Sequence, residues 1–219
     1  MEEHTTEDSG VKNRRAVSAA ATRETIVAAA AALFVERGYH ATSVGDLAAA
    51  AGVAPQTIYN AVGTKREVLS AVLDTAAAGA RGPTPVPVFL RAAAEQEADP
   101  RRILDQLVEF WTGAMVRTAP IFNVIRQAAA LDAEVAELER TRTGQRRRNY
   151  AAAAALLAER GGLRDGLDVD DAAALIFALG HPETYRALVI DGGWPLERWA
   201  AWVGDALAVA LLPPGGQVR

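Results

Sequence analysis

Polar and cationic side chains gather in the stretch DLAAAAGVAPQTIYNAVGTKREVL, residues 46–69. Residues 56–66 include two amides, a hydroxyl before the next break, a phenol and two cations, namely Gln56, Asn60, Thr57, Tyr59, Lys65 and Arg66. Amides and hydroxyls can read the edges of nucleic-acid bases, whereas cations neutralise phosphates. These residue types therefore suit a nucleic-acid surface, provided that the backbone presents them on one exposed face.

The segment before these residues predicts a short helix over 44–51. Ser43 and Asp46 have the spacing of a capping box, and Leu47 begins an apolar face. Gly52 is a natural stop, because glycine adopts the left-handed conformation that ends many helices.

A second short helix is predicted over 54–60. Pro55 stands in its first turn, where a missing N–H does no harm, and the GVA connection before it is tight. Ile58 faces inward, which leaves the polar side chains to face outward. Two helices joined this closely form a helix-turn-helix.

A further helix begins at Thr64, which has the T-x-x-E spacing of a capping box with Glu67. Lys65 and Arg66 then occupy a first turn where the helix dipole disfavours cations, at a cost of roughly a few tenths of a kcal/mol. A phosphate bound there would reverse this cost, because free N–H groups and both cations would face it. The alternative is that both cations are plain solvated surface.

One longer helix is predicted before the helix-turn-helix, over 18–37, with Thr22 as a candidate N-cap and Gly38 as its stop. Residues 1–17 are polar and almost free of large apolar groups, so we expect them to form a disordered arm.

The charge of the chain is unevenly distributed. The net charge is −4 over 219 residues, yet residues 12–66 carry seven Lys and Arg against three Asp and Glu, which favours an anionic partner for this segment. The absence of cysteine excludes disulfide scaffolds and thiolate metal sites. No signal peptide or run of eighteen apolar residues is recognised, so we expect a cytoplasmic protein that does not span a membrane.

Residues 64–219 predict only helices separated by short breaks. The breaks are a Pro-rich segment at 81–88, the AP pair at 119–120 and the GG pair at 161–162. They delimit helices over 88–97, 100–118, 121–130 and 132–160. The basic run RTRTGQRRR, residues 140–148, is expected to be a solvated face of the longest helix rather than a second nucleic-acid patch.

Two last helices are expected after Asp168, a good N-cap. Pro182 should kink or split the first, and Pro195 starts the second, whose apolar arc is wide. The two helices suit a four-helix interface with the same helices of a second copy. We therefore expect a homodimer held by residues 172–190 and 196–212.

Catalytic and metal-binding motifs are not found. The histidines His4, His40 and His181 lack metal-ligand spacing, and no P-loop, G-x-S-x-G or G-x-G-x-x-G occurs. We expect no enzyme activity, cofactor or metal. Apolar and aromatic side chains between helices can line a pocket for a small apolar ligand, and the candidate pocket residues are Trp111, Met115, Phe122, Phe177 and His181. Taken singly, each is more often a core residue, and His181 a hydrogen-bonded one.

Residues 22–73 resemble the DNA-binding domain of the TetR family of bacterial transcriptional regulators. The resemblance rests on four motifs in order: FVERGY, TSVGDLA, AGVAPQTIY and GTKREVL. It implies an all-α fold with a helix-turn-helix head over 18–63, a helical regulatory and dimerisation body over 64–219, and a homodimer on a palindromic operator. By position, the family's phosphate contacts correspond to Thr42, Ser43, Tyr59 and Lys65, and its base-facing residues to Gln56 and Thr57.

Two hypotheses follow. The favoured one is a repressor that a small, mainly apolar effector releases from double-stranded operator DNA. The alternative is a helical small-molecule-binding or interaction protein whose helix-turn-helix no longer reads DNA. Ala54 stands where the family commonly has a Ser or Thr cap, and Ala61 and Val62 replace its usual bulky aromatics, so the short helix has weaker support.

Overall fold

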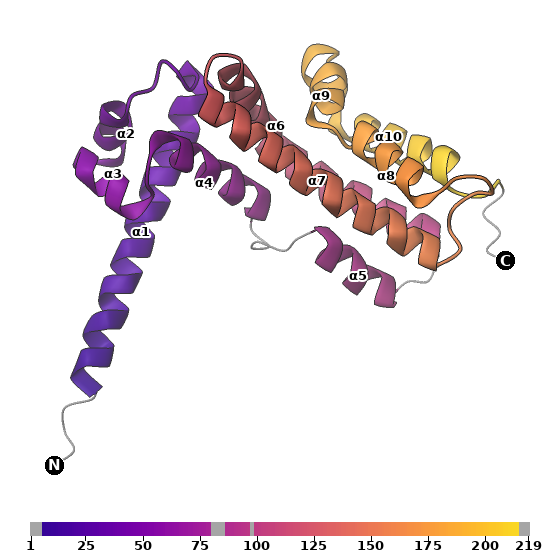
Figure 1. Cartoon of the computed structure of the whole chain (residues 1–219), viewed down its shortest axis with the longest axis horizontal. Helices are drawn as coiled ribbons and strands as arrows, with labels where there is room; N and C mark the ends of the chain where they lie inside the picture. The colour runs from indigo at the N-terminus through magenta and orange to yellow at the C-terminus, as the bar shows by residue number, and fades with distance from the viewer. Residues whose placement is uncertain (1–5, 80–85, 97–98, 215–219) are drawn as a thin grey trace. The chain divides into compact units, whose positions relative to one another are not determined.

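The computed structural model describes residues 6–79, 86–96 and 99–214, and every regular element in these ranges is a helix (Figure 1). The expected all-α fold class is confirmed. The chain divides into two compact units, of which the first comprises Met1–Thr75 and Asn123–Ala136 and the second Ala76–Phe122 and Glu137–Arg219. The boundary between the units falls between Thr75 and Ala76, inside the helix that begins after Thr64. The boundary expected from the sequence lay before this helix, between residues 63 and 64.

The first unit contains the helix-turn-helix. Its elements are α1 (Thr6–Arg37), α2 (Val44–Ala51), α3 (Pro55–Ala61) and most of α4 (Lys65–Ala78). Helices α2 and α3 contact each other, and both contact α1 (Figure 1). Their fully buried side chains form the core beneath the turn: Ile26, Phe34, Leu47, Ile58, Val68 and Leu69.

Local signals set the ends of α2 as predicted. Ser43 Oγ accepts from Asp46 N at 3.1 Å, while Asp46 Oδ2 accepts from Ser43 N at 2.8 Å. Each side chain thus satisfies a backbone N–H that the helix start leaves free. Gly52 ends the helix in the left-handed conformation, with φ +67°.

The start of α1 differs from the prediction. The helix begins at Thr6, so residues 6–17 are helical rather than a disordered arm, and residues 1–5 lie outside the described residues. Thr22 is not an N-cap, because its hydroxyl donates to Ser18 O at 2.9 Å within the helix. No proline interrupts residues 6–37, so the backbone of the long helix can continue through them.

By length and composition alone, α1 could also cross a membrane over Ala16–Arg37, which the sequence analysis did not predict. Its largest apolar side chains have a different explanation. Ile26 and Phe34 are fully buried, and α1 contacts both α2 and α3. The apolarity of this helix therefore serves the core of the first unit.

The second unit is a helical body. Its elements are α5 (Val86–Gln96), most of α6 (Pro100–Ala129) and of α7 (Ala133–Glu159), α8 (Val169–Leu179), α9 (Pro182–Tyr185), the π-helical segment η2 (Arg186–Asp191) and α10 (Leu196–Leu211). Helices α8 and α10 lie side by side (Figure 1). Trp111, Tyr150 and Trp199 are the largest aromatic residues of its core, each less than 5% exposed.

Proline acts differently at two predicted breaks. Pro120 does not interrupt α6, which continues through it to Ala129. The missing N–H frees the carbonyl of Val116, and water can hydrate that carbonyl because Val116 and Pro120 lie on the exposed side. Pro182 does split the C-terminal region as predicted, since α8 ends at Leu179 and α9 starts at Pro182.

Most of the other predicted helix bounds lie within two residues of the observed ones. The exception to the expected break at 81–88 is that α5 begins at Val86, so residues 86–88 are helical; Pro87 lies in the first turn, where a missing N–H does no harm. Asp132 caps α7 by accepting from Glu134 N at 2.9 Å, and Asp168 caps α8 by accepting from Asp171 N at 2.8 Å. Gly161, with φ +64°, follows the end of α7. Most of the Pro-rich segment at 81–88 lies outside the described residues.

Candidate functional site

Helix α3 presents the polar face that its sequence predicts. Gln56, Tyr59 and Asn60 are exposed, Tyr59 at 49%, whereas Thr57 is half-buried and Ile58 is fully buried. Gln56 Nε2 donates to Asn60 Oδ1 at 3.1 Å, so the two amides lie together on the surface. Three amide N–H groups, one on Gln56 and two on Asn60, and the Gln56 carbonyl remain for an external partner, which is the chemistry that base edges require.

Both ends of α3 have specific support, although Ala54 provides no side-chain cap. At the start, Pro55 needs no N–H partner. At the end, Arg23 Nη1 donates to Ala61 O at 3.0 Å, and Gly63 N donates to Ile58 O at 3.0 Å. Arg23 comes from α1, 38 residues earlier, and no local pattern in the sequence predicts this contact.

The start of α4 is a capping box, as predicted. Glu67 Oε2 accepts from Thr64 N at 2.7 Å, and Thr64 Oγ1 accepts from Glu67 N at 3.3 Å. The hydrogen bonds from Thr64 hold the pKa of Glu67 below its usual value. Gly63 has φ +119°, and a Cβ atom there would lie 2.2 Å from Glu67 Oε2, so the turn into α4 requires glycine twice over.

Lys65 is tied to the loop between α1 and α2. Its Nζ atom donates to Tyr39 O and to Thr42 O, both at 3.0 Å, and lies 4.1 Å from the centroid of the Tyr39 ring. Burial lowers the pKa of Lys65. Two of the three ammonium N–H groups are therefore used inside the unit. Arg66, by contrast, lies beside Glu134, with its Nε 3.7 Å from Oε2.

The two residues at the start of α2 differ in exposure. Thr42 is fully buried, and its hydroxyl donates to Gly38 O at 2.8 Å. The expectation that its side chain contacts phosphate is not supported, because that side chain reaches no surface. Ser43 is exposed, with its hydroxyl donating to Asp46 Oδ2 at 2.6 Å. Thr42 therefore positions the loop, and Ser43 lies at its surface.

The second unit brings most of the predicted pocket residues together. Ring centroids are 5.5 Å apart for Trp111 and Tyr150, 6.2 Å for Tyr150 and Phe177, and 5.2 Å for Phe177 and His181. Burial raises the pKa of Tyr150 to about 12, so this phenol is neutral. Met115 is 4% exposed and belongs to the same core. Gly180 makes room for Trp111, since a Cβ there would lie 2.5 Å from the indole.

His181 has a structural role in this group. Its Nδ1 atom accepts from Glu183 N at 3.2 Å, so it caps α9. Burial and then the charge of Arg146 lower the pKa of His181, which favours the neutral ring. With Nδ1 as acceptor, the proton of the neutral ring resides on Nε2.

The basic run at 140–148 is not a solvated face throughout, which corrects the expectation. Arg140, Arg147 and Arg148 are exposed, but Arg142 and Arg146 turn inward and are half-buried. The guanidinium carbon of Arg146 lies 4.5 Å from the Phe122 ring centroid. The signal was present in the sequence, because positions 142 and 146 continue the face of Leu138 and Tyr150 at helical spacing.

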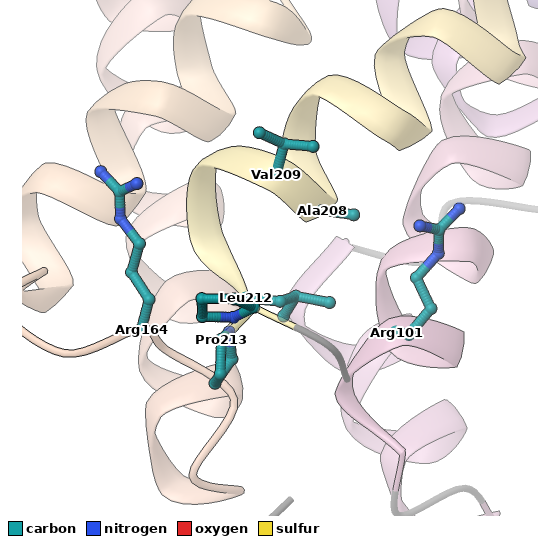
Figure 2. Close-up of a pocket in the computed structure, with 7 residues that line it drawn as sticks. Arg101, Arg164, Ala208, Val209, Leu212 and Pro213 are labelled. Carbon is teal, nitrogen blue, oxygen red and sulfur yellow. The ribbon is translucent and has the colours of Figure 1, made fainter. Parts of the chain in front are cut away.

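A separate surface pocket of about 500 Å³ lies at the end of α10 (Figure 2). It is lined by Arg101, Arg164, Ala208, Val209, Leu212, Pro213 and Pro214, with the two arginines on opposite sides. Arg101 is already paired, to Asp105 at 3.1 Å and to Asp205 at 3.2 Å. None of the five predicted pocket residues lines this space.

Arg117 is a further residue that the sequence did not single out. Its Nε donates to Ala76 O at 2.9 Å, and its Nη1 donates to Gly113 O. It thereby joins the last turn of α4 to α6 inside the second unit. Gly79 follows with φ +54°, where a Cβ would lie 2.6 Å from the guanidinium, so the end of α4 is shaped around Arg117.

Comparisons with known proteins fit the first unit most directly. Residues 26–72 match the family model described as bacterial regulatory proteins, tetR family. This segment contains α2, α3 and the capping boxes of α2 and α4. The resemblance to the TetR family is therefore confirmed over these residues. No curated protein matches the sequence at a significant level.

Solved structures share the fold over most of the chain. The complex of SmeT with triclosan has a TM-score of 0.70 at 23% identity, covering 91% of this chain and 95% of that one. NalD, the secondary repressor of the MexAB-OprM multidrug efflux pump in Pseudomonas aeruginosa, has a TM-score of 0.70 at 22% identity, covering 91% and 100%. FadR from Bacillus subtilis in complex with stearoyl-CoA has a TM-score of 0.64 at 20% identity, covering 84% and 97%. At these identities the similarity establishes the fold.

Proposed function

We propose that this protein is a DNA-binding transcriptional regulator that acts as a homodimer and responds to a small molecule. One observation carries the proposal: the polar face of α3 is exposed while contacts with α1 and α2 hold the helix in place. Ile58 anchors it from below, Arg23 holds its last carbonyls, and Gly63 ends it. A helix too short to be stable alone is kept in place for its surface.

The surface divides into two chemical roles. Gln56, Thr57 and Asn60 offer amide and hydroxyl groups for base edges. Tyr59 and the third ammonium N–H of Lys65 serve phosphates, which position the protein on the duplex, and Ser43 joins them when its hydroxyl turns from Asp46 to a phosphate. Thr42 contributes by holding the loop that carries Ser43.

The alternative, a helix-turn-helix that no longer reads DNA, draws on one observation. Ala54 makes no side-chain cap, which costs about 1 kcal/mol relative to Ser or Thr. The hydrogen bond from Arg23 to Ala61 O offsets a similar amount at the other end, since an exposed hydrogen bond contributes roughly 0.5–1.5 kcal/mol. Helix α3 is thus stabilised at its C-terminal end instead of by a side-chain cap at its start.

Dimerisation is proposed through α8 and α10. One face of α10 is buried in its own unit, with Trp199, Val203, Leu207 and Leu211 each fully buried. Trp202 and Val209, seven residues apart on another face, are 38% and 78% exposed. Large apolar side chains left exposed at this spacing suit a self-complementary helix interface.

Control by an effector is proposed through α4, which begins in the first unit at Lys65 and ends in the second at Ala78. Arg117 fixes its end, and the capping box with Lys65 fixes its start. A small, mainly apolar effector in the second unit would release DNA by preferring an arrangement in which the two helix-turn-helix units are wrongly spaced. Repression, relieved by the effector, is the mode we propose.

The first experiment is a gel shift with DNA from directly upstream of the protein's own gene. The variant Gln56→Ala/Asn60→Ala should lose specific retardation. The variant Val35→Ala, at a half-exposed apolar site on α1, should bind as the parent does. Equal binding of all three proteins to this DNA and to an unrelated fragment would favour the alternative.

A further inference from the structure

Buried hydrogen-bond donors without acceptors lie in the aromatic cluster of the second unit. They are Arg146 Nε, Arg146 Nη1 and Trp111 Nε1. Trp111 Nε1 lies near the Tyr150 hydroxyl, but without a hydrogen bond of good geometry. Arg146 has one polar contact, from Nη2 to Thr143 Oγ1 at 3.3 Å. Buried donors nearly always find partners, so this group lacks an acceptor.

The surroundings of Arg146 stabilise its charge without supplying that acceptor. Its guanidinium carbon lies 4.5 Å from the Phe122 ring centroid and 5.7 Å from that of Phe177. Each such contact contributes about 0.5–2 kcal/mol. The desolvation of a cation costs several kcal/mol, and ring faces offer its N–H groups no lone pair. The charge therefore remains poorly compensated by the protein.

Neighbouring charges do not remove this imbalance. Burial lowers the pKa of Arg146, and the charge of Glu139 opposes that effect without forming an ion pair with it. Glu183 is engaged by Arg186 at 2.9 Å. Arg147 adds a second cation 4.9 Å from the Phe177 ring centroid. Two cations thus border the ring of Phe177.

The guanidinium of Arg146 is bordered by aromatic side chains. Trp111 and Tyr150 are buried, but Phe122, Phe177 and His181 are each half-buried, as Arg146 is. Rings that are partly exposed on either side of a cation form an apolar border around a polar centre. A molecule with an apolar body and one anionic group has the complementary chemistry.

We propose that Arg146 binds the anionic group, such as a carboxylate, of an amphiphilic effector whose apolar part lies against Phe122 and Phe177. The inference rests on the proposed function in one respect, since it names the chemistry of the effector. Nη1 is cis to Cδ, so Nε and Nη1 of Arg146 lie on different edges of the guanidinium, and Nη2 shares an edge with each. Nη2 uses only one of its two N–H groups on Thr143 Oγ1, so a carboxylate can accept a bidentate pair on the edge that this bond leaves open. Trp111 Nε1 offers a further neutral donor in the same cluster.

The test compares an anion with its neutral isostere. Isothermal titration of the full-length protein, without DNA, uses 2-naphthoate and 2-naphthamide, which differ in charge and hardly in shape. The parent should bind the carboxylate about tenfold or more tightly than the amide, as a charge-assisted pair predicts. Arg146→Gln should bind both alike. Arg148→Gln, which removes an exposed cation two residues further along α7, should keep the preference.

Acetate distinguishes an amphiphile from a bare anion and should bind at least about tenfold more weakly than 2-naphthoate, because it buries little apolar surface. A second readout needs no ligand. Arg146→Met should melt no lower than the parent, because the arginine makes no ion pair that the variant would lose.

Three results would overturn the inference: equal or undetectable binding of naphthoate and naphthamide to the parent, a carboxylate preference that survives Arg146→Gln, or acetate as tight as naphthoate. Failure of the proposed function has a different signature, since the parent would keep its naphthoate preference and yet retain no DNA specifically in the gel shift.

Discussion

Arg23 Nη1 donates to Ala61 O at 3.0 Å, which joins the long helix α1 to the last turn of α3. The carbonyls at a helix end have no partner within the helix, and the dipole there favours a cation. One side chain therefore satisfies both needs at the end of the helix that presents Gln56 and Asn60. The orientation of the proposed DNA-reading face depends on a residue that need not touch DNA.

Arg23→Met should weaken operator binding about fivefold, corresponding to the loss of about 1 kcal/mol from the end of α3. The slope of binding against salt concentration should stay nearly constant, because Arg23 acts by positioning. Fluorescence anisotropy at three salt concentrations measures both quantities. A slope reduced by about one per subunit would instead make Arg23 a phosphate contact.

Lys65→Ala should have two effects, because its ammonium serves both the loop and, as proposed, a phosphate. Leaving the carbonyls of Tyr39 and Thr42 without this donor should lower the free energy of unfolding by about 1–3 kcal/mol. Losing the phosphate contact should reduce the salt slope by about 1 per subunit. Urea denaturation and salt-dependent anisotropy separate the two, and an unchanged slope would leave Lys65 a purely structural role.

Alanine substitutions at Gly63 and at Gly45 should change the stability of the helix-turn-helix in opposite directions, because only Gly63 has a positive φ. Gly63→Ala should destabilise the protein by about 1–3 kcal/mol, because φ is +119° and the new Cβ would meet the Glu67 carboxylate. Gly45→Ala should stabilise it by about 0.5–1 kcal/mol, because the site is helical and the new Cβ would make only an ordinary contact, 3.5 Å from Ser43 Oγ. Thermal melting of both variants checks the signs, and a stabilising Gly63→Ala would contradict the geometry.

The two capping boxes predict how stability depends on pH. Hydrogen bonds from Ser43 and Thr64 lower the pKa values of Asp46 and Glu67 below their ordinary values of 3.8 and 4.5. Their contribution is therefore fully present above those ordinary values and is lost as the pH falls through the lowered ones. The double variant Asp46→Asn/Glu67→Gln should show a shallower loss of stability in acid. Urea titrations from neutral to acidic pH test this, and identical curves would be inconsistent with it.

Trp202→Glu should convert the proposed dimer to a monomer and thereby abolish specific DNA binding, because a charge cannot be buried unpaired in an apolar interface. Val116→Asp, at a 51% exposed site on α6, is the control and should stay dimeric. Light scattering coupled to size exclusion measures the mass. A parent protein that is monomeric at micromolar concentration would refute the dimer proposal.

Features fixed by neighbouring residues could be predicted from the sequence. Ser43 with Asp46 and Thr64 with Glu67 bond over three residues, and glycines at 52 and 63 end helices where the chain itself signals it. Contacts between distant segments could not be predicted in this way. Arg23 reaches Ala61 across 38 residues, and Lys65 reaches Tyr39 across 26.

Burial decided the remaining differences. Thr42 matched a phosphate-contacting position by resemblance, yet its hydroxyl is buried against Gly38 O. Arg146 belongs to a run whose composition suggests solvent, yet its position on α7 turns it into the aromatic cluster. Pro120 was expected to break a helix, but α6 continues through it because the carbonyl that loses its partner faces water. Composition alone cannot distinguish these cases, because each depends on which side of a helix faces the core.

The most direct test of the account is selection of DNA from sheared fragments of the host genome by the full-length protein, followed by footprinting of the recovered sequence. If a dimer reads DNA through α3, the recovered sequence should be an inverted repeat whose half-sites lie in successive major grooves, about 34 Å apart. Protection should be lost in the Gln56→Ala/Asn60→Ala variant. A recovered pool without a common sequence, bound no more tightly than random DNA at physiological salt, would contradict the account.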